Sequence, residues 1–308
     1  MSNPVRMEHL LPGGEPVRFA EANAALARNQ GAGDAALPHG ALRATVVVVG
    51  PTDSLPQAGE ALRELSERVG LRAILIALGT ERSPAVEVNG CAIAIGGLKP
   101  QYVNNAVAAL RLSSLPTAVW WRGGDPGMLE GLAALSDRIV LDEASAPEAG
   151  WKRAIALFSH AAFGDLRWAR LTRWRALLAN FFDAAEVRET AGSFDSVRIC
   201  GADGPTARLL AGWLQTSLEG VARLSVDVTT EPGDAPIREV SLGGPSQELT
   251  LRLAGGGSCV KAAARVAGAR AISRVVTLGD QRAATLLSEE LQVRARDPAF
   301  ERALRAIV

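Results

Sequence analysis

The stretch Thr45-Val-Val-Val-Val-Gly-Pro51 decides the fold class of this chain. Its four consecutive valines form a β-branched apolar run that ends in a glycine–proline turn, a pattern typical of a strand buried on both faces. The amphipathic stretch 54–69 predicts a helix, and the apolar run Leu71–Leu78 predicts a second buried strand. Because such strands alternate with helices, the sequence predicts an α/β fold with a mainly parallel sheet covered on both faces.

The same alternation continues through the first half of the chain. Residues 86–95 are predicted to form a strand region that turns back around Asn89-Gly90. Helices are expected over 17–28, 100–112, 126–135 and 147–163, and strands over 117–121 and 138–141. The sequence therefore predicts an N-terminal α/β domain over residues 1–163.

Beyond Asp183 the pattern of strands and helices restarts. Two antiparallel strands are predicted over 237–242 and 248–253, because the turn-rich Gly243-Gly-Pro-Ser246 separates them. The chain closes with two predicted helices, 282–293 and 298–307. We therefore predict a C-terminal α/β domain with a mixed sheet over residues 191–308.

A Trp/Arg-rich connector helix over residues 164–190 is predicted to join the two domains. It contains Asp165-Leu-Arg-Trp-Ala-Arg-Leu-Thr-Arg-Trp-Arg175, in which two tryptophans and four arginines fall close together. Arg175 falls on the same side of this helix as the apolar residues, where an unpaired buried cation would be unfavourable. Two interpretations remain open: Arg175 extends along the helix to water, or it is held to recognise a carboxylate, a phosphate or a partner's backbone.

This segment, together with Ala176-Leu-Leu-Ala-Asn-Phe-Phe-Asp183, resembles the signature of the glucose-6-phosphate dehydrogenase assembly protein (OpcA) family. Four other pieces resemble that family in the same order: Ala41-Leu-Arg-Ala-Thr-Val-Val-Val-Val-Gly-Pro51, Leu115-Pro-Thr-Ala-Val-Trp-Trp-Arg122, Asp137-Arg-Ile-Val-Leu-Asp142 and Leu209-Leu-Ala-Gly-Trp-Leu214. The resemblance implies a non-enzymatic protein of the oxidative pentose phosphate pathway. Such a protein would bind glucose-6-phosphate dehydrogenase and promote its active oligomer or its affinity for substrate.

Composition limits the classes of partner. The 308 residues carry 33 basic and 33 acidic side chains, so no charge excess points to nucleic acid or to an anionic membrane surface. No apolar run is long enough to span a bilayer, and the first residues lack the apolar core of a signal peptide. We therefore expect a cytoplasmic protein. Cys91, Cys200 and Cys259 lie far apart without a CxxC pair, which argues against a disulfide scaffold or a zinc site.

Polar side chains follow two predicted strands of the first domain. Ligands of open α/β sheets usually lie beyond the carboxyl ends of the strands. Trp121 and Arg122 end one of these strands, and Asp142 follows the next. We predict a pocket formed by these three residues together with Asp165 and Arg175. In an alternative that remains open, Asp142 or Asp165 pairs with an arginine and joins the connector to the sheet.

Candidate catalytic groups are few. His9, His39 and His160 have no Cys or Ser partner in a recognisable motif and no metal-binding spacing. The strand-to-helix turns 50–54 and 201–206 lack the lysine and glycine patterns of nucleotide-binding loops. We therefore expect no enzyme activity, no cofactor and no metal.

The leading hypothesis, which comes from the resemblance, is an assembly factor or allosteric activator whose protein partner is glucose-6-phosphate dehydrogenase. Tryptophan and arginine are frequent interface anchors. The candidate partner- or ligand-binding residues are Trp121, Arg122, Asp142, Asp165, Trp168, Arg170, Trp174 and Arg175. The alternative is a sugar-phosphate- or nucleotide-binding α/β enzyme or sensor, with Arg122 or Arg175 on a phosphate and Asp142 as a base. A third hypothesis is a structural subunit whose Trp/Arg helix seals its own domains, and self-association into a homo-oligomer is left open.

Overall fold

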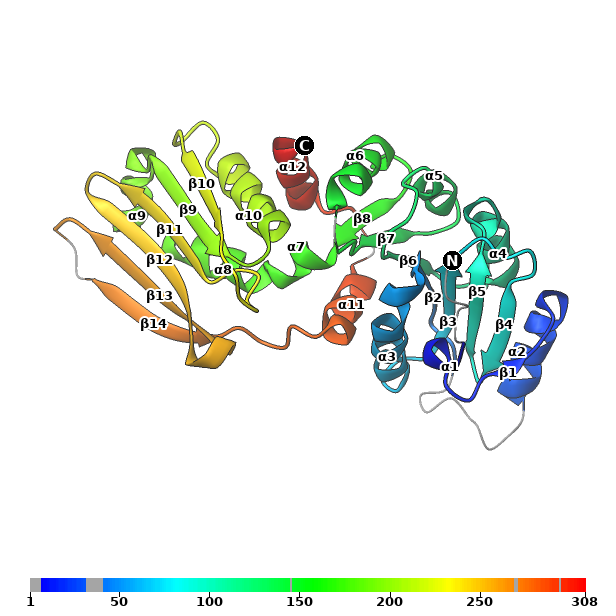
Figure 1. Ribbon diagram of the computed structural model, residues 1–308. Coiled ribbons are helices and arrows are strands. Elements are labelled where there is room, and N and C mark those ends of the chain that lie inside the picture. Colours follow the sequence, from blue (N-terminus) through cyan, green and yellow to red (C-terminus); the bar gives the residue numbers. More distant parts are fainter. Residues whose placement is uncertain (1–6, 32–40, 145, 269–270, 294) are drawn as a thin grey trace. The chain divides into compact units, whose positions relative to one another are not determined.

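The computed structural model describes residues 7–31, 41–144, 146–268, 271–293 and 295–308. The chain divides into two compact units (Figure 1). Unit 1 contains Met1–Leu166 and Arg282–Arg296, and unit 2 contains Arg167–Gln281 and Asp297–Val308. The C-terminal part of the chain therefore contributes to both units in turn.

Unit 1 is built on an eight-stranded sheet with the order β1-β4-β5-β3-β2-β6-β7-β8. Its strands are β1 (Glu15–Pro16), β2 (Ala44–Pro51), β3 (Leu71–Leu78), β4 (Ala85–Asn89), β5 (Ala92–Leu98), β6 (Thr117–Trp121), β7 (Arg138–Leu141) and β8 (Ala162–Asp165). The strands from β5 to β8 in this order are parallel, which confirms the mainly parallel sheet that the sequence predicts. Their order is that of doubly wound folds, with a topological switch point between β2 and β6.

Helices cover both faces of this sheet (Figure 1). They are α1 (Met7–Leu10), α2 (Ala22–Gly31), α3 (Leu55–Ser66), α4 (Val103–Leu110), α5 (Met128–Ala133), α6 (Pro147–Leu157) and α11 (Ala283–Gln292). Helices α3 and α11 pack against each other on one face, and α4, α5 and α6 form a row on the other. This distribution is expected where crossovers are right-handed, because the chain moves across the sheet in one direction and then in the other.

The valine run that decides the fold lies at the centre of unit 1. Residues 46–49 are fully buried, because β2 lies between β3 and β6 and both faces of the sheet are covered. Trp120 and Trp121 project from opposite faces of β6 and are both fully buried for the same reason.

Unit 2 is built on a six-stranded sheet with the order β10-β9-β11-β12-β13-β14. Its strands are β9 (Ser196–Gly201), β10 (Ser225–Thr230), β11 (Glu239–Gly244), β12 (Gln247–Ala254), β13 (Cys259–Val266) and β14 (Ile272–Thr277). Only β9 and β10 pair in parallel, which confirms the predicted mixed sheet. Side chains alternate along the strands: one face carries buried residues such as Val240 and Leu251, and the other carries the ion pair between Arg252 and Glu239.

The helices of unit 2 are α8 (Thr172–Phe181), α9 (Ala185–Glu189), α10 (Gly204–Ser217) and α12 (Pro298–Ile307), preceded by α7 (Leu166–Arg170), which begins at the last residue before the unit boundary. Helices α10 and α12 pack closely. A Cβ atom at Gly212 would lie 2.5 Å from the carbonyl oxygen of Ala303, so this contact requires glycine. In the part of the chain that the structure describes, no helix is both long and apolar enough to cross a bilayer.

The boundaries between the two units differ from the domain boundaries that the sequence predicts. Residues 282–296, predicted within the C-terminal domain, return to unit 1 because Leu286 and Leu287 of α11 are buried there and Glu290 is bound by Arg138. The predicted connector over 164–190 is three short helices, α7, α8 and α9, rather than one. The helix predicted over 147–163 ends at Leu157, because the apolar residues that follow form strand β8.

Candidate functional site

The predicted strand-end residues of unit 1 form a compact polar cluster. Arg122 and Asp142 lie just beyond β6 and β7, and an Arg122 Nη1 atom is 3.3 Å from Asp142 Oδ2. The same carboxylate oxygen accepts a hydrogen bond of 3.1 Å from the Trp120 indole, and the guanidinium carbon of Arg122 lies 4.9 Å from the centre of that ring. Both charged side chains are largely buried, so the cluster is held together by charge, hydrogen bonding and a cation–π contact.

This cluster lies at the switch point, where doubly wound sheets usually bind their ligands. Arg122 also donates a hydrogen bond of 3.1 Å to Gln57 on α3. A Cβ atom at Gly50 would lie 2.9 Å from Arg122 Cβ, so the end of β2 packs directly against the arginine. The Arg122 side chain therefore fills the space beside the end of this strand with protein contacts.

Two other predicted site residues lie inside unit 1. The Trp121 indole is fully buried, and its Nε1 atom has no hydrogen-bond partner among the described residues. Asp165 is also fully buried at the end of β8 and accepts a hydrogen bond of 2.9 Å from the Trp151 indole on α6. Asp142 forms an ion pair with Arg122, which follows the neighbouring strand β6. The predicted pocket, which combines residues of both units, stays a prediction.

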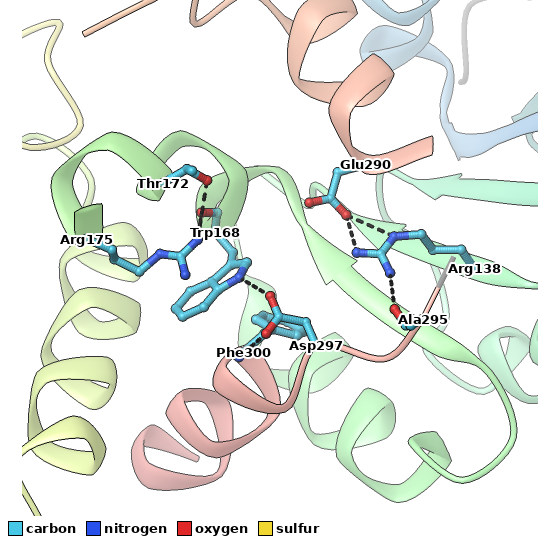
Figure 2. Close-up of polar contacts among 8 residues, drawn as sticks. All are labelled: Arg138, Trp168, Thr172, Arg175, Glu290, Ala295, Asp297 and Phe300. Carbon is cyan, nitrogen blue, oxygen red and sulfur yellow. Dashed lines mark hydrogen bonds and ion pairs between the residues drawn. The ribbon is translucent and has the colours of Figure 1, made fainter. Parts of the chain in front are cut away.

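The Trp/Arg segment is the stretch from Asp165 to Arg175. Its part from Trp168 onward forms a second cluster, within unit 2 (Figure 2). The Trp168 indole donates a hydrogen bond of 2.8 Å to Asp297 Oδ2, while Asp297 Oδ1 accepts from the backbone N–H groups of Ala299 and Phe300 at 3.0 and 3.1 Å. Asp297 is therefore the N-cap of α12 and the partner of Trp168 at once. The rings of Trp168 and Phe300 are 5.6 Å apart between centres, so the contact continues into the apolar core.

Arg175 completes this second cluster. Its guanidinium carbon lies 3.6 Å from the centre of the Trp168 ring, and an Nη2 atom donates to the Thr172 hydroxyl at 3.3 Å. Sequence reasoning left open whether Arg175 extends to water or is held for recognition. The structure places its guanidinium on the indole that anchors α12, an arrangement that supports the fold of unit 2 (Figure 2).

The other two candidates in unit 2 line one cavity. Trp174 is buried and Arg170 is half-buried, and both contribute to a cavity of about 510 Å³. Of the four candidates in this unit, the structure therefore brings Trp168 and Arg175 together in one cluster and Arg170 and Trp174 together in another site.

Residues 161–304 match the family described as the C-terminal domain of the glucose-6-phosphate dehydrogenase subunit. Over this region the chain is similar to the OpcA family, whose curated relatives also match it. The matching region contains nearly the whole of unit 2 and all four candidates of that unit, so the resemblance predicted from the Trp/Arg segment is confirmed.

Two curated relatives carry the name putative OxPP cycle protein OpcA. The one from Synechocystis sp. is 28% identical over 162 residues, covering 50% of this chain and 34% of the relative. The one from Nostoc punctiforme is 26% identical over 249 residues, covering 66% of this chain and 52% of the relative. The chain thus matches about a third and about half of the length of these two OpcA relatives.

Among solved structures, a super-repressor mutant of Gal80p from Saccharomyces cerevisiae gives a TM-score of 0.49 at 11% identity, over 82% of this chain and 83% of that one. An aldose-aldose oxidoreductase from Caulobacter crescentus, complexed with glycerol, gives a TM-score of 0.43 at 12% identity, over 86% of this chain and 95% of that one.

Sequence reasoning missed three carboxylates that bind side chains far away in the sequence. Besides Asp297, they include Glu290, which Arg138 binds, and Asp203, whose carboxylate lies 3.2 Å from Arg167 Nε. Asp297 and Asp203 each come just before a helix that contains proline in its first turn, which is a recognisable capping pattern. That pattern predicts helix starts, but it does not predict which distant side chain the carboxylate binds.

Among the residues that the structure describes, the remaining reactive side chains form no common site. His39 lies outside the described residues, as does the side chain of His9, and His160 lies 3.1 Å from the hydroxyl of its neighbour Ser159. Within the described ranges, no group of three or more His, Cys, Asp or Glu side chains could hold a metal ion. Burial, followed by a hydrogen bond to Glu231, raises the pKa of the Cys200 thiol, which favours its unreactive neutral form.

Proposed function

We propose that this chain is a non-enzymatic partner protein that binds glucose-6-phosphate dehydrogenase and promotes its active oligomer or its affinity for substrate. The observation that carries this proposal is the match of residues 161–304 to a family described as a subunit domain of that enzyme. The names of the two curated relatives, which place those proteins in the OxPP cycle, support it.

An activator of this kind works through differential binding. It must bind the active state of the dehydrogenase more tightly than the inactive state, and the difference in binding free energy then shifts the population. No catalytic group is needed for that purpose. The engagement of Arg122 and Asp142 with each other and with Trp120 supports the non-enzymatic proposal, because the pair predicted to clamp phosphate and act as a base is committed to protein contacts.

The candidate residues take different parts in this proposal. Trp168 and Arg175 would support partner binding indirectly, by fixing the start of α12 and the position of α8. Trp121 and Asp165 are fully buried and would likewise act only through the fold of unit 1. Arg170 is the member of the segment whose charge is available at a cavity.

The proposal is tested with the purified chain and purified glucose-6-phosphate dehydrogenase from the same cell. We expect a complex by size-exclusion chromatography with light scattering, and a fall in the Michaelis constant for glucose 6-phosphate of about fivefold or more. An equal mass of an unrelated protein controls for crowding, and the chain assayed alone controls for intrinsic activity. The absence of both a complex and a kinetic change would dismiss the proposal.

A further inference from the structure

A cavity of about 510 Å³ lies in unit 2, between the Trp/Arg segment and the loops at one end of the sheet. Its walls are mostly apolar and are formed by side chains that include Leu171, Trp174, Pro236, Ile237, Leu253 and Leu278. A volume of this size, with apolar walls and a few polar groups, is typical of small-molecule sites. The description of the family that matches residues 161–304 names no ligand for this cavity.

The charge of Arg170 indicates which kind of ligand the cavity would bind. Arg170 lines the cavity and is half-buried, yet it has no hydrogen-bond or ion-pair partner among the described residues. Its neighbours on the same segment are engaged: Arg167 pairs with Asp203, and Arg175 lies on Trp168. A partly desolvated cation beside apolar walls gains most from an anionic group that supplies the missing hydrogen-bond acceptors.

Two glycines form part of the lining of this cavity. Gly256 and Gly257 line the cavity with φ angles of +66° and +95°, in the left-handed region that favours glycine. Apart from the adjoining residues and the backbone of the same turn, no atom lies within 4 Å of the position that a Cβ would take at either residue, so a ligand can approach this backbone closely. Asp234 also lines the cavity and is exposed, and its negative charge disfavours a ligand that carries several anionic groups.

We propose that this cavity binds a small organic molecule with an apolar body and one anionic group, a carboxylate or a phosphate monoester. The anionic group would accept hydrogen bonds from Arg170, and the apolar body would pack against Trp174 and Ile237. This site belongs to unit 2 and shares no residue with the strand-end cluster of unit 1, and it does not depend on the proposed function.

The first test uses two fluorescent probes that differ mainly in charge. 8-Anilinonaphthalene-1-sulfonate has an apolar body and one anionic group, and N-phenyl-1-naphthylamine is its neutral counterpart. We expect saturable binding of the anionic probe to the folded chain, weakened about five- to tenfold by Arg170→Gln. The neutral probe should keep its affinity for that variant. Arg302→Gln, which removes an exposed charge elsewhere in unit 2, is the matched control and should change neither affinity.

A second variant and a competition series locate the site. Ala235→Trp fills the cavity and should weaken both probes, whereas circular dichroism should show an unchanged fold. Octanoate and octyl phosphate should displace the anionic probe at lower concentrations than 1-octanol. Equal effects of Arg170→Gln on both probes, or displacement that does not depend on charge, would overturn the proposal. Displacement by glucose-6-phosphate dehydrogenase but by no small acid would also overturn it, since the cavity would then be a protein docking site.

Discussion

Two polar clusters hold neighbouring parts of the same C-terminal segment, and they use different chemistry (Figure 2). In unit 1, Arg138 donates to Glu290 of α11, with Nε 3.0 Å from Oε2, and to the carbonyl oxygen of Ala295 at 3.3 Å. In unit 2, Asp297 receives its hydrogen bonds from neutral donors, the Trp168 indole and two backbone amides. One cluster is a buried ion pair, and the other is a helix cap extended by a side chain.

The difference predicts how each cluster responds to the loss of one partner. Side-chain exposures of 5% for Arg138 and 8% for Glu290 mean that removing the carboxylate leaves a charge with little access to water. Removing Asp297 leaves only neutral donors, for which the desolvation cost is smaller. The strand-end cluster of unit 1 lies between these cases, because Asp142 receives both the Arg122 charge and the Trp120 indole.

The largest effect is expected for Glu290→Ala. The change leaves Arg138 buried without its carboxylate and should lower the free energy of unfolding of unit 1 by about 3–5 kcal/mol. Urea unfolding followed by tryptophan fluorescence and circular dichroism measures it. Glu289→Ala, which removes an exposed carboxylate one residue away, should have almost no effect. A loss below about 1 kcal/mol for Glu290→Ala would show that the ion pair is open to solvent.

The strand-end cluster is expected to respond to Asp142→Ala with a loss of about 2–3 kcal/mol from unit 1. The change removes the carboxylate that pairs with Arg122 and accepts from the Trp120 indole. The side chains of Arg122 and Asp142 are 9% and 14% exposed, so water compensates in part for the loss. Asp142→Asn keeps an acceptor for the indole and should recover part of the loss. Equal losses for the two variants would mean that only the charge contributes.

For unit 2 we expect Asp297→Ala to cost about 2 kcal/mol, because it removes the cap of α12 and the acceptor for Trp168 together. Asn is also a good N-cap and can accept from an indole, so Asp297→Asn should lose less than half as much. The loss in the free energy of unfolding is measured from the unfolding transition of unit 2. If both variants lose the same amount, the carboxylate charge matters more than the hydrogen bonds, and the contrast with the ion pair of unit 1 disappears.

These contrasts also show what the sequence could predict. The valine run of β2, the Leu71–Leu78 run and the alternation with helices predict the doubly wound unit 1, because each signal lies within one element. The mixed sheet of unit 2 follows in the same way from strands separated by a short turn, such as β11 and β12. Local periodicity therefore predicts most of both sheets, but not β8, whose first residues are predicted as the end of a helix.

The clusters around Arg138 and Trp168 could not be predicted, because their partners are far apart in the sequence. Trp168 and Asp297 are separated by 129 positions, and Arg138 and Glu290 by 152. Nothing in the pattern of α11 distinguishes a helix that stays with the C-terminal sheet from one that returns to unit 1. The Trp/Arg segment is unusual in the sequence. The sequence does not indicate which of its arginines bind other side chains within the fold, as Arg175 does, and which line a cavity, as Arg170 does.

The smallest effect is expected for Arg175→Ala, and it separates a structural role from a recognition role. The change removes a cation from the Trp168 ring and a bond to Thr172, and should cost unit 2 about 1 kcal/mol. Arg173→Ala, on the exposed side of α8, is the matched control and should cost almost nothing. If Arg175 only supports Trp168, activation of glucose-6-phosphate dehydrogenase per folded molecule should be the same for both variants. A selective loss of activation in Arg175→Ala, with the unfolding transition unchanged, would instead show that the guanidinium contacts the partner protein. The Trp168 cluster would then be a contact surface rather than an internal anchor.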